Sequence, residues 1–169
     1  VFVYTIWLKR KTPQNIVIGG ASGALPPVIG WTIATNSLTF EPITFFLIIF
    51  FWTPSHFWAL SLYKADDYQK AKIPMLPITN GIEETKKNIF VYSLIMLPIV
   101  ILPYYIGFVG ETFLVVSLLL TFYYNYVCYD LLKFKKNKFE IKNAKKVFSY
   151  SIFYLFLLFL LFLVDQIIK

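Results

Sequence analysis

Apolar residues fill long, almost uncharged stretches of this chain, with no alternation of polar and apolar positions inside them. Each stretch is about 20 residues long, which is the length an α-helix needs to cross roughly 30 Å of hydrocarbon. The five stretches are residues 16–34, 42–63, 88–108, 112–132 and 147–164. The pattern predicts an all-α protein, a polytopic transmembrane helical bundle with five full spans.

The polar connections between these stretches alternate in charge. Residues 36–41 and 107–111 contain no Lys or Arg, whereas residues 9–11, 64–87 and 133–146 contain three, five and seven. Together they hold all but one of the 16 basic residues of the chain. If the spans alternate in direction, these residues share one side, and the positive-inside rule makes that side cytoplasmic. Charge and parity therefore agree on five spans and on cytoplasmic basic loops.

Composition supports a lipid bilayer as the surroundings of the chain. Apolar residues make up 58% of it and charged residues only 15%, against about 25% charged residues in an average soluble domain. The net charge of +7 does not indicate nucleic-acid binding, because the topology of the loops already accounts for it. The single cysteine, Cys128, excludes an intrachain disulfide and a cysteine-cluster metal site; it is expected to be a small apolar filler of a helix.

Two helix-disrupting features occur in the first full span. Gly19 and Gly23 have the spacing that lets a neighbouring backbone approach closely. Pro26 and Pro27 lack two backbone donors, so the helix should kink or break there. Such breaks persist at membrane depth only where they are buried in protein or line a cavity, so this span is a candidate cavity wall. The last span is apolar all round and is expected to be an outer, lipid-facing helix.

The long basic connection after the second span holds two adjacent carboxylates, Asp66 and Asp67. Mg²⁺ prefers one or two carboxylates together with water and phosphate oxygens, and Lys64 and Lys70 could meet further phosphate charge. An ordinary solvated loop is the alternative interpretation.

A second basic group, Lys9 and Arg10, lies at the end of the apolar segment 1–8. Arg can bind phosphate through two hydrogen bonds and Lys adds a point charge; a purely topogenic role is the alternative. The segment is too short to span a membrane, and Val1 is not Met. It is therefore expected to be the end of a preceding helix, which would make the chain the C-terminal part of a longer protein.

His56, the one histidine, lies about two helical turns inside the second span. An ionisable group within a span is a functional hypothesis by default. A hydrogen-bonded interior histidine without a ligand is the alternative.

Four motifs in order resemble a known family. They are YTIWLKR-x-TPQNIVIGG (4–20), GA-x-PP-x-IGW (23–31), FWTP-x-HFWAL (51–60) and DY-x-x-A-x-IPMLP (67–77). This set is similar to the protoheme IX farnesyltransferases (heme O synthases), a branch of the UbiA-type intramembrane prenyltransferases. The match is dense over residues 4–81 and thins over the last three spans. It implies that residues 1–169 are the C-terminal part of a single nine-helix transmembrane domain, that the N-terminal helices are absent, and that the fragment alone is inactive.

The resemblance implies an activity and its participants. Such enzymes transfer the farnesyl group of farnesyl diphosphate to a vinyl group of heme B, giving heme O and diphosphate on the route to heme A and the cytochrome oxidase cofactor. It implies Mg²⁺ as cofactor, heme A synthase as a partner and a bacterial inner membrane, with the active-site loops cytoplasmic. The residues implied are Asp67, Asp66 and Lys64 for catalysis, Asp67 and Asp66 for metal, Lys9, Arg10, Lys64 and Tyr4 for diphosphate, and His56, Trp52 and Tyr68 for heme.

Two departures from the family pattern affect this transfer of roles. The first Asp-rich motif of the family would lie before Val1. In many relatives the second motif is D-x-x-x-D, but Ala71 and Lys70 stand four residues after Asp67 and Asp66. Asp67 is preferred as the ligand because the heme branch has an Asp directly before the Tyr. The alternatives are a UbiA-type prenyltransferase acting on an aromatic quinone precursor, and a non-enzymatic transporter or assembly protein.

Overall fold

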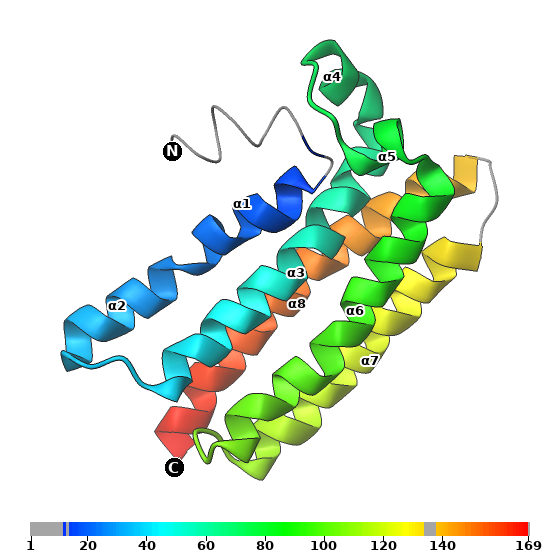
Figure 1. Ribbon diagram of the computed structural model, residues 1–169. Helices are drawn as coiled ribbons and strands as arrows, with labels where there is room; N and C mark the ends of the chain where they lie inside the picture. Colours follow the sequence, from blue (N-terminus) through cyan, green and yellow to red (C-terminus); the bar gives the residue numbers. More distant parts are fainter. Residues whose placement is uncertain (1–11, 13, 134–137, 169) are drawn as a thin grey trace.

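The computed structural model describes residues 12, 14–133 and 138–168. The secondary structure of these residues is entirely helical, which confirms the predicted fold class (Figure 1). The elements are α1 (Asn15–Ala24), α2 (Pro26–Thr35), α3 (Phe40–Tyr63), α4 (Ala65–Lys70), α5 (Leu76–Thr79), α6 (Ile82–Tyr105), α7 (Glu111–Lys133) and α8 (Lys138–Ile168).

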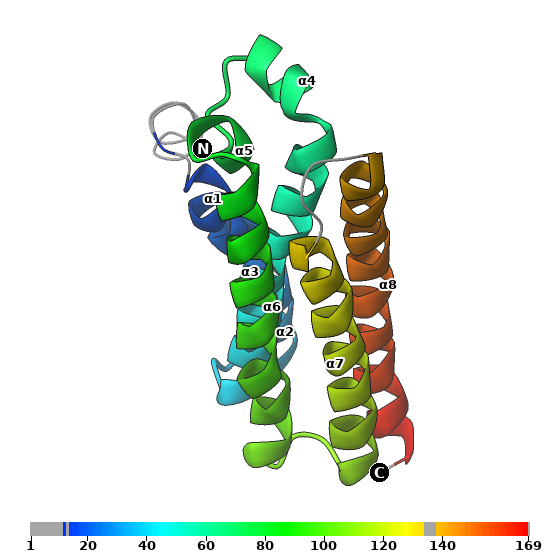
Figure 2. The same cartoon turned by 90° about the vertical axis from the view of Figure 1, so that its right-hand side faces the viewer.

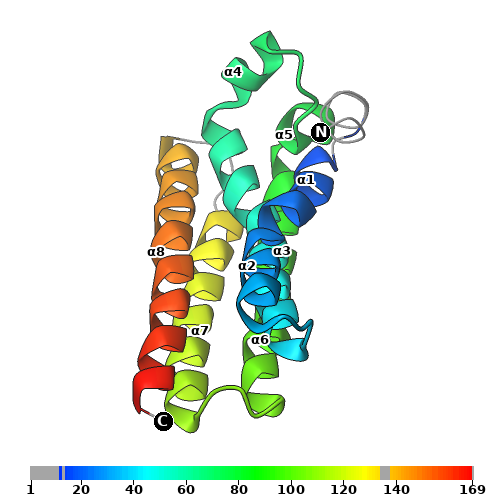
Figure 3. The same cartoon turned by 90° about the vertical axis from the view of Figure 1, so that its left-hand side faces the viewer.

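Four long helices form the body of the molecule. Helix α3 packs against α6 and α8, and α7 packs against the same two helices, so the four enclose one core (Figure 2). Helix α1 lies against α3 from outside this bundle (Figure 3). Within the described residues, five helical segments are long and apolar enough to cross a membrane: α1 with α2, then α3, α6, α7 and most of α8. The five predicted spans are therefore confirmed.

The helix break predicted at the double proline is present. Helix α1 ends at Ala24 and α2 begins at Pro26, with Leu25 between them. Proline has no backbone N–H and its ring clashes with the preceding turn. The first span therefore consists of two short helices with a break between them.

Basic residues gather at one end of the bundle. Figure 1 shows α4, α5, the start of α6, the end of α7 and the start of α8 at the same end. The α2–α3 and α6–α7 turns lie at the opposite end. The described members of the two long basic segments therefore share one end, as the charge pattern predicts. The segment 9–11 lies outside the described residues.

Helix α8 has two different faces although its sequence is apolar all round. Residues at helical spacing are buried against the bundle: Ala144, Val147, Ser151, Tyr154, Leu158, Phe162 and Asp165. The opposite face exposes Phe153, Phe156 and Leu163. The helix is an outer one, as expected, but its exposed face alone fits the predicted lipid-facing role.

The connection from Tyr63 to Ile82 is ordered into two short helices that the sequence pattern does not predict. Only Lys64 separates the end of α3 from the start of α4. Beyond α4, Lys72 has a left-handed backbone conformation (φ 53°) that turns the chain back. Gly81 (φ 88°) directly precedes α6, and only glycine adopts such a φ without strain. The connection contacts the end of α3 and Asn15 of α1, and it lines part of a cavity there.

Candidate active site

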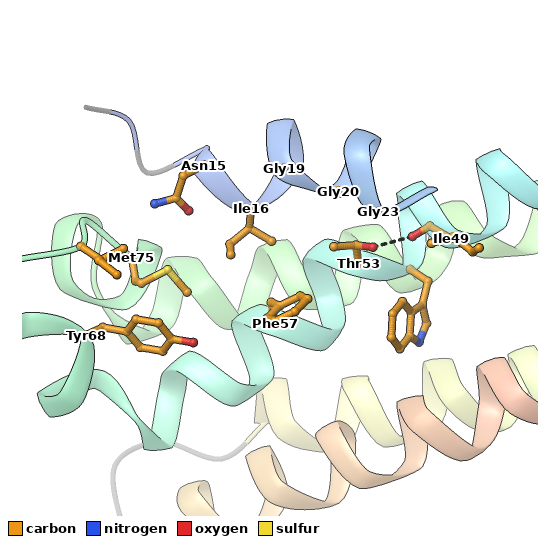
Figure 4. A pocket seen from close by; sticks show the side chains of 12 residues that line it. Asn15, Ile16, Gly19, Gly20, Gly23, Ile49, Thr53, Phe57, Tyr68 and Met75 are labelled. Carbon is orange, nitrogen blue, oxygen red and sulfur yellow. Dashed lines mark hydrogen bonds between the residues drawn. The ribbon is translucent and has the colours of Figure 1, made fainter. Parts of the chain in front are cut away.

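A cavity of about 420 Å³ lies between α1 and α3 (Figure 4). Helix α1 contributes Asn15, Ile16, Gly19, Gly20 and Gly23. Helix α3 contributes Ile49, Trp52, Thr53 and Phe57. The α4–α5 region contributes Tyr68, Ile73 and Met75. Pockets of this volume, mostly apolar with a few polar groups, are typical of small-molecule sites.

The glycines of α1 bring its backbone close to α3 and leave room beside it. A Cβ added at Gly20 would lie 3.2 Å from Cγ2 of Thr53, so this glycine makes the close approach between the helices. A Cβ added at Gly23 would meet no heavy atom of the described residues within 4 Å. Gly20 therefore makes a close approach to α3, whereas Gly23 borders open space. Helix α1 of this span forms a cavity wall, but Pro26 and Pro27, on which that prediction rested, do not line the cavity.

The two ends of the cavity differ in polarity. Asn15 and Tyr68 lie at the end nearest α4 and α5, and Gly23 and Ile49 at the other (Figure 4). Thr53, between the ends, donates its hydroxyl proton to the Ile49 carbonyl oxygen at 2.6 Å. The hydroxyl proton of Thr53 is therefore used within α3 and is not available to a ligand in the cavity. The cavity therefore has a polar end at Asn15 and Tyr68, which we call its mouth, and an apolar far end at Gly23 and Ile49 (Figure 4).

The polar mouth includes two side chains held by the α4–α5 connection. The Asn15 side-chain nitrogen is 3.4 Å from the Pro74 carbonyl oxygen. The Tyr68 hydroxyl points into the cavity (Figure 4) and makes no hydrogen bond to any other described residue. Burial, and secondarily the nearby Asp67 charge, raises the pKa of Tyr68. A raised pKa favours the protonated form, so this hydroxyl is a donor at neutral pH.

The acidic pair and its lysine do not line this cavity. Asp67 directly precedes Tyr68 on α4, and Asp66 lines a separate hollow with Gln69 and Lys70. Asp66 and Asp67 occupy the first turn of α4 and are exposed. The Lys64 Nζ lies 3.0 Å from Oδ2 of Asp67. This hydrogen bond, with the Asp67 charge, raises the pKa of Lys64, which keeps the ammonium charged. An exposed ion pair of this kind is weak, so Lys64 can leave it for a stronger anion.

The acidic pair meets the minimum requirement for magnesium. No group of three or more His, Cys, Asp and Glu side chains gathers in a metal-binding arrangement among the described residues. Mg²⁺ is commonly held by only one or two carboxylates, with waters and substrate phosphates completing the shell. Asp66 and Asp67 are exposed on the first turn of α4, but consecutive residues of a helix do not face each other, so either carboxylate alone fits a magnesium ion whose other ligands are water and a bound phosphate group.

His56 lies on the opposite side of α3, facing α8. Its Nδ1 is 2.7 Å from the Ser151 hydroxyl, which also donates to the Phe148 carbonyl oxygen at 2.6 Å. Since a hydroxyl has one proton, the tautomer with Nδ1–H donating to Ser151 is the one that satisfies both contacts. Nε2 of His56 then carries the lone pair. The imidazole stacks between Trp52 and Phe148, with ring centroids 4.3 and 4.6 Å away.

This histidine lines a second hollow of about 290 Å³ between α3 and α8. The other side chains around it are Trp52, Ile152, Leu155, Phe156 and Phe159. Trp52 lines both this hollow and the larger cavity, and its indole N–H donates to the Ser151 carbonyl oxygen at 2.9 Å. His56 therefore does not border the larger cavity, and one side chain, Trp52, connects the two spaces.

The predicted site residues are only partly brought together. Trp52 and Tyr68 line the larger cavity, Lys64, Asp66 and Asp67 lie outside its mouth, and His56 lies in the second hollow. Tyr4, Lys9 and Arg10 lie outside the described residues. Sequence reasoning missed Asn15 and Thr53 as lining residues. Both residues occur in the motifs quoted above, and their place in those motifs could have indicated that they line the site.

Comparison with known proteins gives a consistent family. The model of the UbiA prenyltransferase family matches residues 1–157. A protoheme IX farnesyltransferase of Pelagibacter ubique is 77% identical over 168 residues, covering 99% of this chain and 55% of that protein. One of Parvibaculum lavamentivorans is 48% identical, covering 98% and 52%. The chain thus spans about half the length of these curated relatives. No solved structure matches it.

Proposed function

Because this chain belongs to the UbiA prenyltransferase family, we propose that it is part of an enzyme that transfers the farnesyl group of farnesyl diphosphate to a vinyl group of heme B. Water adds at the same step, and the products are heme O and diphosphate. The names of the most similar relatives support this choice of substrates over an aromatic quinone precursor.

One observation carries the proposal: the cavity between α1 and α3 is mostly apolar and has a polar end at Asn15 and Tyr68, and Tyr68 directly follows Asp66 and Asp67 on α4. A prenyl diphosphate has the same division, with an apolar chain and a doubly phosphorylated head. In the proposed binding mode the chain lies along the glycines of α1. The head lies near Tyr68, Lys64 and Asp67.

The chain's own residues can assist departure of the diphosphate. Breaking the allylic C–O bond places negative charge on the leaving group, and preorganised donors stabilise such charge. Lys64 supplies a mobile ammonium and Tyr68 a neutral hydroxyl donor. Asp66 and Asp67 would hold Mg²⁺, which when bound supplies positive charge to the diphosphate.

The lining of the cavity suits the allylic cation left behind. Phe57 and Trp52 present aromatic rings along α3, and aromatic faces attract cations. The apolar walls limit stray water, so the heme vinyl group competes better for the cation. Phe57 and Trp52 are therefore proposed to direct the cation towards the heme.

Heme B is assigned to the second hollow. Nε2 of His56 carries a lone pair and Nδ1–H is anchored on Ser151, the arrangement that metal-bound histidines generally show. His is also a common axial ligand of heme iron. Trp52 lines both this hollow and the larger cavity, so the vinyl group of the heme and the prenyl chain would meet beside its ring.

The membrane assignment follows the charge of the loops. The protein is a multi-pass membrane protein, and we assign it to a bacterial inner membrane with the α4 end in the cytoplasm. Heme A synthase, which consumes heme O, is the proposed partner enzyme.

The test is direct conversion. The whole reading frame is expressed in a host without its own heme O synthase, and membranes are supplied with heme B, farnesyl diphosphate and Mg²⁺. We expect heme O, identified by its mass, and its loss when EDTA replaces Mg²⁺. Prenylation of an aromatic quinone precursor with heme left unchanged would overturn the proposal.

A further inference from the structure

Gly23 of α1 and Ile49 of α3 line the far end of the α1–α3 cavity (Figure 4). Asn15 and Gly23 are eight residues apart on α1, and Phe57 and Ile49 are eight apart on the antiparallel α3 (Figure 4). At 1.5 Å per residue, each wall is about 12 Å long. The slot is therefore long in one direction and is bounded on its two sides by single helices.

This shape suits a linear chain better than a disc. An extended prenyl chain of three isoprenoid units is of the same order of length as the slot and is only one methyl-branched chain wide. A porphyrin ring is as wide as it is long, and so does not match a slot that is long in one direction only. The polar mouth at Asn15 and Tyr68 would bind the diphosphate, so the prenyl chain would lie with its last unit at Gly23.

Gly23 differs from its neighbours in what surrounds it. A side chain at Gly20 would meet Thr53, whereas a side chain at Gly23 would extend into space that contains no heavy atom of the described residues within 4 Å. Gly23 lines the cavity and has ordinary helical geometry within α1. Its lack of a side chain is therefore not required by the backbone or by packing on α3.

We infer that Gly23 is a specificity-determining residue, because the space beside it admits the last isoprenoid unit of the prenyl donor. This inference rests on the proposed function. A side chain at this position would fill the far end of the slot, exclude a chain of three units and still admit one of two. Hydrophobic pockets discriminate by about 10-fold to 200-fold for each methylene-sized difference.

The experiment compares donors in the enzyme expressed from the whole reading frame. The ratio of kcat/KM for geranyl over farnesyl diphosphate is measured with heme B for the wild type, Gly23→Ala and Gly23→Leu. We expect this ratio to rise in Gly23→Leu by at least about 10-fold, and to rise in the same direction but less in Gly23→Ala. The KM for heme should not change.

Gly30 supplies the matched control. It is helical, in α2, and a Cβ there also meets no described heavy atom within 4 Å, but it does not line the cavity. Gly30→Leu should leave the donor ratio unchanged. A shift in both leucine variants would mean a general perturbation of the span and would overturn the inference.

Failure of the inference differs from failure of the proposed function. If the wild type prenylates heme with neither geranyl nor farnesyl diphosphate, the function and the inference are refuted together. An active wild type with an unchanged donor ratio in Gly23→Ala would overturn the inference alone, even if Gly23→Leu did not insert. A raised KM for heme with an unchanged donor ratio would place the porphyrin in the slot instead.

Discussion

Asp66 and Asp67 are neighbours in sequence and both are exposed, yet their surroundings differ. Asp67 accepts a hydrogen bond from Lys64, 3.0 Å away, whereas Asp66 forms no ion pair within the described part of the chain. Asp67 also directly precedes Tyr68, whose ring lines the cavity. Asp67 therefore connects the cavity mouth with the lysine, and Asp66 is the more peripheral of the two carboxylates.

This difference predicts unequal effects of two matched substitutions. Asp67→Asn should lower the turnover of heme B to heme O by about 10²–10³, the usual loss for one preorganised electrostatic contact. Asp66→Asn should lower it less, although both remove one negative charge from α4. The measurement is kcat in membranes with the amount of inserted protein quantified. Equal mild losses would mean that the charges serve only solvation of the connection, and a larger loss at Asp66 would reverse the assignment.

The lone pair on Nε2 of His56 depends on a hydroxyl from another helix. If His56 binds heme iron, His56→Ala should weaken heme binding and change the Soret spectrum. Ser151→Ala should weaken binding less, because the ligand stays but its orienting hydrogen bond is lost. Heme titration followed by absorbance measures both. Unchanged heme affinity and turnover in His56→Ala would leave the histidine with a packing role between Trp52 and Phe148.

At the scale of elements, the end of α8 fastens the α6–α7 turn. Both carboxyl oxygens of Asp165 lie 3.0 Å from the Gly110 backbone nitrogen, and the Gln166 amide donates to the Phe108 carbonyl oxygen at 2.9 Å. Asp165 is buried and Gln166 is exposed. The turn is held by two side chains of one helix that differ in burial.

Asp165→Ala should therefore destabilise the bundle more than Gln166→Ala. Leaving a partly buried N–H without an acceptor costs about 1–3 kcal/mol, while water can replace the exposed amide. Asp165→Asn, which keeps one acceptor oxygen, should fall between them. Thermal unfolding in detergent measures the order. A larger loss in Gln166→Ala than in Asp165→Ala would contradict it.

Long elements were predictable from sequence and short ones were not. The five spans follow from apolar length alone, and the break at Pro26 follows from missing backbone donors. Helices α4 and α5 carry no such signal, because α5 is fixed by tertiary burial of Leu76 and Pro77. The sequence also could not show which face of α8 is buried, because the lipid and the protein core both favour apolar side chains. For the site, the motifs identified Trp52 and Tyr68 but could not show that His56 faces away from the cavity.

At the scale of the whole molecule, the bundle has two chemically different ends. Lys64, Lys70 and Lys72 lie at the α4 end, whereas Glu111 begins α7 at the other (Figure 1). Anchoring of this kind is what the positive-inside rule describes. The orientation of the whole protein is therefore open to a test with one residue from each end.

We expect Lys72→Cys to be labelled only from the cytoplasm and Glu111→Cys only from the periplasm. Both positions are exposed, and the native thiol of Cys128 is fully buried, so the background should be low. The measurement is labelling of intact cells with a membrane-impermeant maleimide, before and after permeabilisation. Labelling of Lys72→Cys in intact cells, with Glu111→Cys protected, would invert the topology.

The broken first span has a mechanical consequence. Pro26 and Pro27 cannot donate to the carbonyl oxygens one turn earlier, so bending at Leu25 disrupts fewer hydrogen bonds than bending elsewhere in the span. Helices α1 and α2 can change their mutual angle while each stays intact, as at other proline kinks. Helix α1 is packed against α3, whereas α2 has no buried residue in the described structure. Bending at Leu25 would therefore move α2 and leave the wall of the slot that α1 forms in place.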